Sequence, residues 1–138
     1  MASIRLTHVS KHWGATRALD GIDLDIAPAS FCVLLGPSGC GKSTTLRIIA
    51  GLEAASAGQV FIDGRDVTAL APSQRGIAMV FQNYALFPHL SVADNIAFGL
   101  SVRKVDKAET ARRLPDAAGV LGLASLVQRG PPSVAGGP

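Results

Sequence analysis

The stretch Gly36-Pro37-Ser38-Gly39-Cys40-Gly41-Lys42-Ser43 decides the fold, because it fits the pattern G-x-x-x-x-G-K-[ST] at every fixed position. Glycines allow a backbone to wrap a phosphate with its N–H groups pointing inward, and a helix that follows adds its positive N-terminal dipole. The lysine brings a point charge to the phosphates, and the serine hydroxyl is a ligand for Mg²⁺. The sequence therefore predicts a phosphate-binding loop for a nucleoside triphosphate from Gly36 to Thr44.

The residues on either side of the loop support this prediction. Residues 31–35 form a continuous apolar run, which is typical of a strand buried on both faces. From Lys42 to Leu52 the apolar residues recur at helical spacing. Two further short apolar runs, 59–63 and 77–81, are predicted to be strands. Together these elements indicate an α/β fold built on a phosphate-loop core.

Two stretches before the loop alternate between apolar and polar residues. In the first, residues 4–9, the apolar positions include Ile4 and Leu6, with His8 on the same face. The second covers residues 22–26, and a turn near Trp13 separates the two. This arrangement predicts an antiparallel β-subdomain at the N-terminus.

The C-terminal part of the chain has helical character. Ser91 is expected to cap a short helix that runs through Phe98, with Asp94 completing a capping box. Residues 106–121 are rich in alanine and predict a second helix, which Pro115 should kink or split. Residues 130–138 are rich in glycine and proline and show no periodicity.

Composition and charge narrow the class of protein. The chain has 138 residues, 48% of them hydrophobic, which is typical of one globular domain. Its formal net charge of +3 comes from scattered basic residues, which argues against nucleic acid as a partner. Cys32 is expected in the core and Cys40 in the loop, so no disulfide framework is predicted. We find no signal peptide and no apolar run approaching the ~20 residues of a membrane span, so a cytosolic protein is expected.

At this point the chain resembles a known family. The loop and the segment 46–52 look like the ATP-binding subunit of ABC transporters. Residues 75–90 resemble the Q-loop segment of importer ATPases that serve carbohydrates and glycerol phosphate, and residues 95–100 continue the likeness. The resemblance implies an incomplete P-loop NTPase core with its β-subdomain in residues 1–89. It further implies a helical subdomain in residues 90–129 and a degenerate signature tail in residues 130–138.

The resemblance assigns roles residue by residue. Trp13 falls where the family places an aromatic ring that stacks on adenine, and base stacking tolerates a change of ring type. Lys42 and Gln82 take catalytic roles, and Ser43 and Gln82 are the implied Mg²⁺ ligands. Thr44 matches a residue that contacts the α-phosphate. The complete set implied for ATP binding is Trp13, Gly36, Ser38, Gly39, Cys40, Gly41, Lys42, Ser43 and Thr44.

The family also implies partners. The apolar, aromatic segment from Tyr84 to His89 matches a socket for a helix of the membrane-spanning transporter subunits. A second ATP-binding subunit would complete a dimer, on the inner face of the cell membrane. The implied function is ATP binding for import of a solute such as a sugar or glycerol phosphate.

The chain departs from the family near its end. Residues 134–138 stand where the signature motif is expected, but Ala135 lacks the hydroxyl of the family's serine and Pro138 replaces a glutamine. No strand ending in Asp-Glu follows, so the 138 residues supply neither a Walker B pair nor a switch histidine. We therefore expect a truncated ATPase subunit that binds ATP but is deficient in hydrolysis.

Two alternatives remain open at this stage. The first is a non-catalytic remnant that holds nucleotide without turning it over. The second is a soluble ABC ATPase that is not linked to transport, although such proteins generally lack the segment Phe87-Pro88-His89.

Overall fold

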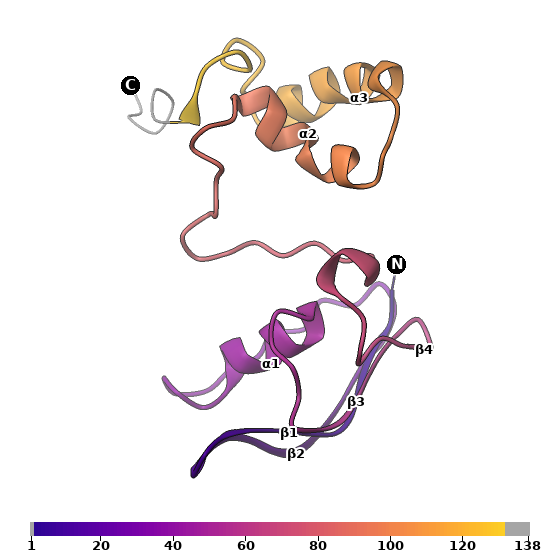
Figure 1. Ribbon diagram of the computed structural model, residues 1–138, viewed down its shortest axis with the longest axis vertical. Helices are drawn as coiled ribbons and strands as arrows, with labels where there is room; N and C mark the ends of the chain where they lie inside the picture. The colour runs from indigo at the N-terminus through magenta and orange to yellow at the C-terminus, as the bar shows by residue number, and fades with distance from the viewer. Residues whose placement is uncertain (1, 132–138) are drawn as a thin grey trace. The chain divides into compact units, whose positions relative to one another are not determined.

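The computed structural model describes residues 2–131, and the chain divides into two compact units, Met1–Met79 and Val80–Pro138. The first unit contains a β-sheet and helix α1, and the second contains helices α2 and α3 (Figure 1). Residues 132–138, which make up most of the predicted signature tail at 130–138, lie outside the described residues.

A four-stranded antiparallel sheet forms the frame of the first unit, in the order β2-β1-β3-β4. Its strands are β1 (Ile4–Trp13), β2 (Thr16–Ile26), β3 (Ala57–Ile62) and β4 (Arg65–Asp66). A tight turn joins β1 to β2, where Trp13 pairs with Thr16 and Gly14 takes a positive φ of 56°. The predicted N-terminal antiparallel sheet is confirmed.

The alternation predicted for β1 is wrong at His8, because the strand contains a β-bulge. Leu6 and Val9 are both buried, at 2% and 0% exposure, whereas His8 is exposed with a φ of 49°. The extra residue between Leu6 and Val9 shifts the register, so His8 does not share the buried face as the simple period of two predicts. Gly58 on β3 lies opposite, where a Cβ would come within 2.4 Å of the His8 carbonyl oxygen.

Helix α1 (Lys42–Ala50) packs on one face of this sheet (Figure 1). The core of the unit joins this helix to the three longer strands, and its buried members are Leu6, Val9, Leu19, Ile48, Ile49, Val60, Ile62 and Val67. The helix ends two residues before the predicted Leu52, because Gly51 takes a left-handed φ of 78° and its N–H bonds back to Ile48.

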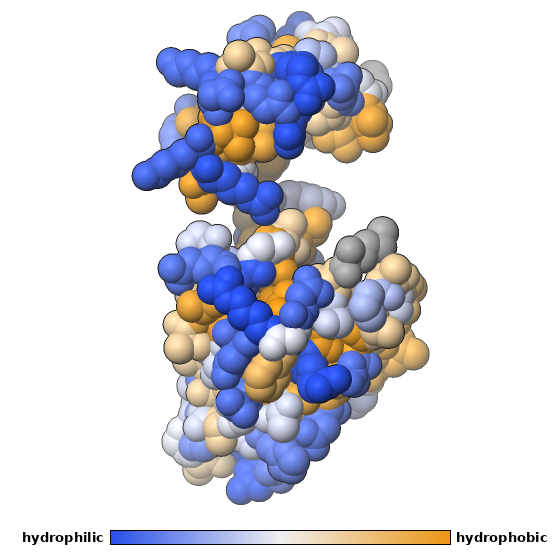
Figure 2. Space-filling model, turned by 90° about the vertical axis from the view of Figure 1, so that its right-hand side faces the viewer, coloured by the Kyte–Doolittle hydropathy of each residue, from blue (hydrophilic) through white to orange (hydrophobic). Residues whose placement is uncertain are grey.

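Two segments predicted to be strands, the first of them buried on both faces, are not strands in the structure. Within the described residues, neither 31–35 nor 77–81 is paired with another strand. Phe31 is 94% exposed, Val80 is 89% exposed, and Cys32, expected in the core, is also exposed. Apolar strands of this kind are buried only when neighbouring strands and covering helices lie against them. Figure 2 shows orange, apolar patches among the hydrophilic surface of both units.

The second unit is a pair of helices, α2 (Val92–Val102) and α3 (Lys107–Val120), which pack against each other. Ser91 caps α2 as predicted, since its Oγ accepts a hydrogen bond from the Asp94 N–H at 3.1 Å. The Asp94 carboxylate accepts from the Ser91 hydroxyl rather than from its backbone N–H, so the capping box is only half formed.

Pro115 does not split α3, which continues through it to Val120. A proline removes one intrahelical hydrogen bond, and the remaining bonds of the helix carry it past this position. Among residues 2–131, no helix combines the length and the apolar character needed to cross a lipid bilayer.

Arg75 ties the end of α1 to the segment that follows β4. Its side chain is buried at 7% exposure just after the short 3-10 helix η1 (Pro72–Gln74), and burial lowers its pKa. The guanidinium donates hydrogen bonds to four backbone carbonyls, those of Ile48, Ile49, Thr68 and Leu70, at 2.8 to 3.1 Å. A guanidinium is suited to bind four carbonyls at once, because its five N–H groups point in different fixed directions within one plane.

Replacing Arg75 by methionine should lower the free energy of unfolding by about 3 kcal/mol, because buried carbonyls lose their charged donor. Urea unfolding of the parent chain and of Arg75→Met measures the change. Arg65→Met, which removes an exposed arginine from β4, is the matched control and should change stability by less than about 0.5 kcal/mol. Equal effects of the two substitutions would contradict the role given to Arg75.

Candidate phosphate-binding site

The loop before α1 takes its shape from glycines with positive φ. Gly39 has a φ of 79° and Gly41 a φ of 94°, conformations that residues with a Cβ rarely adopt. Gly41 is the N-cap of α1, and no side chain accepts a hydrogen bond from the first turn. The first N–H groups of a helix have no intrahelical acceptor, so this end of α1 presents backbone donors and a positive dipole.

Gly41 also holds the loop against the sheet. A Cβ at this position would lie 2.6 Å from the Leu19 side chain and 2.8 Å from the Ala18 carbonyl oxygen, so only glycine allows this approach to β2. On the helix side, the buried Thr45 bonds to the Gly41 carbonyl through both its N–H, at 2.8 Å, and its hydroxyl, at 2.9 Å. The start of α1 is therefore fixed to the β-hairpin.

Lys42 folds over the loop that precedes it. Its ammonium donates hydrogen bonds of 2.7 Å to the carbonyl oxygens of both Gly36 and Pro37, and lies 3.4 Å from Cys40 Sγ. A Cβ on Gly36 would come within 2.6 Å of the same sulfur, so the loop is closely packed at this point. The positive charge is thus held against the loop backbone rather than extended into solvent.

A cavity of about 400 Å³ opens beside the loop. It is lined by the hairpin end of the sheet and by the loop with the first turn of α1, namely Trp13, Thr16, Arg17, Ala18, Ser38, Gly39, Gly41, Lys42, Ser43 and Thr44. Of the described residues in this lining, Arg17 and Lys42 are cationic and none is acidic. Two positive charges, a helix N-terminus and four hydroxyls make this cavity suited to an anion.

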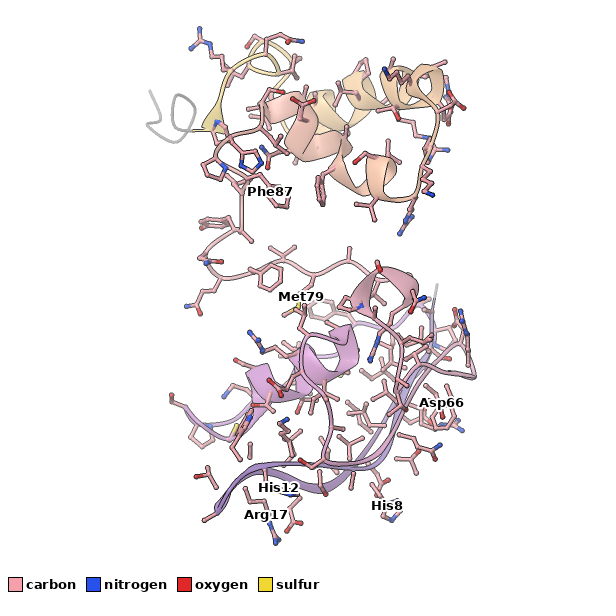
Figure 3. All side chains as sticks on the ribbon, viewed as in Figure 1. His8, His12, Arg17, Asp66, Met79 and Phe87 are labelled. Carbon is pink, nitrogen blue, oxygen red and sulfur yellow. The ribbon has the colours of Figure 1, made fainter. Side chains whose placement is uncertain are left out.

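An aromatic ring lines the same cavity as the hydrogen-bond donors that suit a phosphate. Trp13 lies at the end of β1 with half of its surface exposed, so a flat ring can stack on it. Arg17 pairs with His12 across the hairpin, near whose turn Figure 3 labels both residues. Sequence reasoning missed Thr16, Arg17 and Ala18, although the position of Thr16 opposite Trp13 across a predicted turn is the signal that could have found them.

The structure brings together most, not all, of the predicted site. Those that line the cavity are Trp13, Ser38, Gly39, Gly41, Lys42, Ser43 and Thr44. Gly36 and Cys40 belong to the loop and contact Lys42 but do not line the cavity. Gln82 belongs to the second unit, where its side chain is exposed.

The segment from Tyr84 to His89 is exposed in the second unit. Tyr84 is 78% exposed and takes a φ of 62°. Asn95 of α2 fixes the loop, because its side-chain amide accepts from the Phe87 N–H at 3.0 Å and donates to the Phe87 carbonyl at 3.1 Å. The Phe87 ring, labelled in Figure 3, packs on Phe98 with ring centroids 4.5 Å apart.

The fold and the loop define a P-loop nucleotide-binding protein. The chain belongs to the ABC transporter family, since residues 19–137 match that family. It is 53% identical over 137 residues to an sn-glycerol-3-phosphate import ATP-binding protein of Rhizobium johnstonii. This match covers 99% of this chain and 37% of the relative. It is 51% identical to an oligosaccharides import ATP-binding protein of Bacillus subtilis, covering 99% of this chain and 38% of the relative. The chain thus spans less than two-fifths of the length of these curated relatives.

Solved structures agree with this fold. One is an ATP-binding cassette in a dimeric, post-hydrolysis state bound to ADP and Pi, with a TM-score of 0.82 and 28% sequence identity. The match covers 95% of this chain and 62% of the solved chain. A second ATP-binding cassette of an ABC transporter matches 99% of this chain and 60% of its own, with a TM-score of 0.80 at 24% identity. The chain therefore has the α/β fold of an ABC-type P-loop NTPase, in incomplete form.

Substituting Gly41 by alanine should lower the free energy of unfolding by about 2 kcal/mol, because the new Cβ meets backbone and a positive φ at once. Gly39→Ala supplies the matched control, since its φ is also positive but no atom lies within 4 Å of its Cβ position. Urea unfolding of both variants should show the larger loss for Gly41→Ala. The close contact with Ala18 would be disproved by losses of the same size.

Proposed function

We propose that this chain binds Mg·ATP in the cavity beside the loop Gly36–Thr44, as the nucleotide-binding part of an ABC importer subunit. The observation that carries the proposal is the pairing, in one cavity, of a half-exposed Trp13 with Lys42, Ser43 and the uncapped start of α1. The first suits a base, and the others suit phosphates. The match of the loop to the nucleotide-binding pattern and the similarity to import ATP-binding proteins support the same assignment.

The residues present fit a nucleotide with its magnesium ion. The space beside Gly39 is open, since no atom lies within 4 Å of its Cβ position, and the lining carries cations without carboxylates. Lys42 would hold the β- and γ-phosphates, Thr44 the α-phosphate and Trp13 the adenine. The hydroxyl of Ser43 would be a Mg²⁺ ligand, and Gln82 is the proposed second one. Bound Mg²⁺ would neutralise phosphate charge during transfer.

The partners and location follow from the same assignment. The exposed segment Tyr84 to His89 is the proposed contact for a membrane-spanning transporter subunit, and a second ATP-binding subunit is the proposed dimer partner. The segment's exposed aromatic and apolar side chains suit a helix from another protein. A sugar or a glycerol phosphate is the proposed solute, because both named relatives serve such substrates. The protein would work on the cytoplasmic face of the membrane.

Lys42→Ala tests the binding proposal. The affinity for Mg·ATP should fall by about 10- to 100-fold, because a charge-assisted contact to phosphate contributes roughly 1.5–3 kcal/mol. Isothermal titration calorimetry gives the two dissociation constants, and Lys107→Ala, an exposed lysine of α3, is the control with unchanged affinity. An ATP affinity that does not depend on Lys42 would refute the site.

The 138-residue chain should bind ATP with little hydrolysis. No described carboxylate lines the cavity, so no group there is placed to orient an attacking water or accept its proton. A phosphate-release assay on the purified chain, with Lys42→Ala as blank, should show turnover far below about 1 s⁻¹. Release at that ordinary enzyme rate, lost in the blank, would instead require a base outside the cavity lining.

A further inference from the structure

Lys11 is a buried lysine that does not line the cavity. It lies on β1 two residues before Trp13 and is 8% exposed. Its Nζ lies 2.6 Å from Glu53 Oε1, donates a hydrogen bond of 2.8 Å to the Ala54 carbonyl, and lies 5.1 Å from the centre of the Trp13 ring. A buried ammonium is costly unless it is paired, and these three contacts account for its burial.

The three contacts connect the two parts of the proposed nucleotide site, the aromatic ring on the sheet and the helix that begins at the phosphate loop. Trp13 lines the cavity from the sheet. Glu53 and Ala54 belong to the segment just after α1, the helix whose first turn carries Lys42. Lys11 therefore links the aromatic ring to the same helix that presents the phosphate-binding charge.

We propose that Lys11 is a positioning residue for Trp13, and through it a determinant of how strongly this site binds the base of a nucleotide. This inference rests on the proposed function, because it concerns recognition of the base in that same cavity. Lys11 is buried and absent from the cavity lining, whereas Trp13 lines the cavity and has half of its surface exposed.

Two physical effects make the cation useful in this place. An ammonium over an indole ring is attracted to the negative face of the ring, which limits the rotamers open to a half-exposed tryptophan. A ring already held in place loses less conformational freedom when a base stacks on it. The hydrogen bond from Lys11 to the Glu53 carboxylate, which lowers the pKa of that carboxyl, holds the ammonium in place.

A purely structural role would have a different signature. If Lys11 only fastened α1 to the sheet, its loss would disturb the phosphate loop and weaken every ligand that the loop binds. If it positions Trp13, its loss weakens only ligands that carry a base. Mg·ATP and Mg·tripolyphosphate, which has the phosphates without the nucleoside, separate the two roles.

The experiment compares the parent chain with Lys11→Met, which keeps an unbranched apolar stem and removes the charge. By isothermal titration calorimetry, the affinity for Mg·ATP should fall by about 3- to 10-fold, the range of a partly desolvated cation–π contact. The affinity for Mg·tripolyphosphate should stay within about twofold of the parent value. The emission of Trp13, the single tryptophan, should shift in the free variant because a nearby charge is lost.

Further variants sharpen the result. Lys11→Arg keeps a cation and should retain most of the preference for ATP, whereas Arg5→Met, which removes an exposed cation from the same strand, should change neither affinity. In a Trp13→Leu background, Lys11→Met should have no further effect on ATP binding. If Lys11→Met fails to fold, Glu53→Gln weakens the same anchor without emptying the site and should give a smaller loss, again confined to ATP.

Equal losses for ATP and tripolyphosphate, or no loss for either, would overturn the positioning role while leaving the nucleotide site intact. Failure of the parent chain to bind both ligands would instead overturn the proposed function, and the inference on Lys11 with it. The two failures are distinguished by the parent titrations alone.

Discussion

The contact between Gly41 and the backbone of β2 is the constraint on which the first unit depends. It lets the start of α1 approach the Ala18 carbonyl more closely than any residue with a Cβ could. Because of this approach, the helix N-terminus, Lys42 and the end of the hairpin open on one cavity. A loop of the same composition without this anchor would keep its local shape but would lose its place beside Trp13.

The local features of the fold could be predicted from the sequence, and the non-local ones could not. The phosphate loop, the helix after it and the hairpin around Gly14 are set by residues close in sequence. Segments 31–35 and 77–81 were predicted as strands from their apolar character alone, and that prediction was wrong for this chain. An apolar strand is buried only when neighbouring strands from distant parts of the sequence lie against it, and among the described residues neither segment is paired with one.

The site shows the same division. The motif pointed to the loop residues that line the cavity, but Arg17 and Lys11 carry no motif of their own. Their importance arises from contacts across the hairpin and with the segment after α1, which single-sequence patterns do not report. The bulge at His8 is a further case, because a period of two cannot reveal where a strand gains one residue.

The clamp that Asn95 makes on Phe87 has a kinetic consequence. One side chain satisfies both backbone polar groups of Phe87, so this part of the loop is already ordered while Tyr84 and Leu86 remain exposed. Another molecule that contacts these side chains meets a surface that needs little rearrangement on encounter. Such a surface supports fast association. The lifetime of the contact then depends on how well the partner covers the exposed side chains.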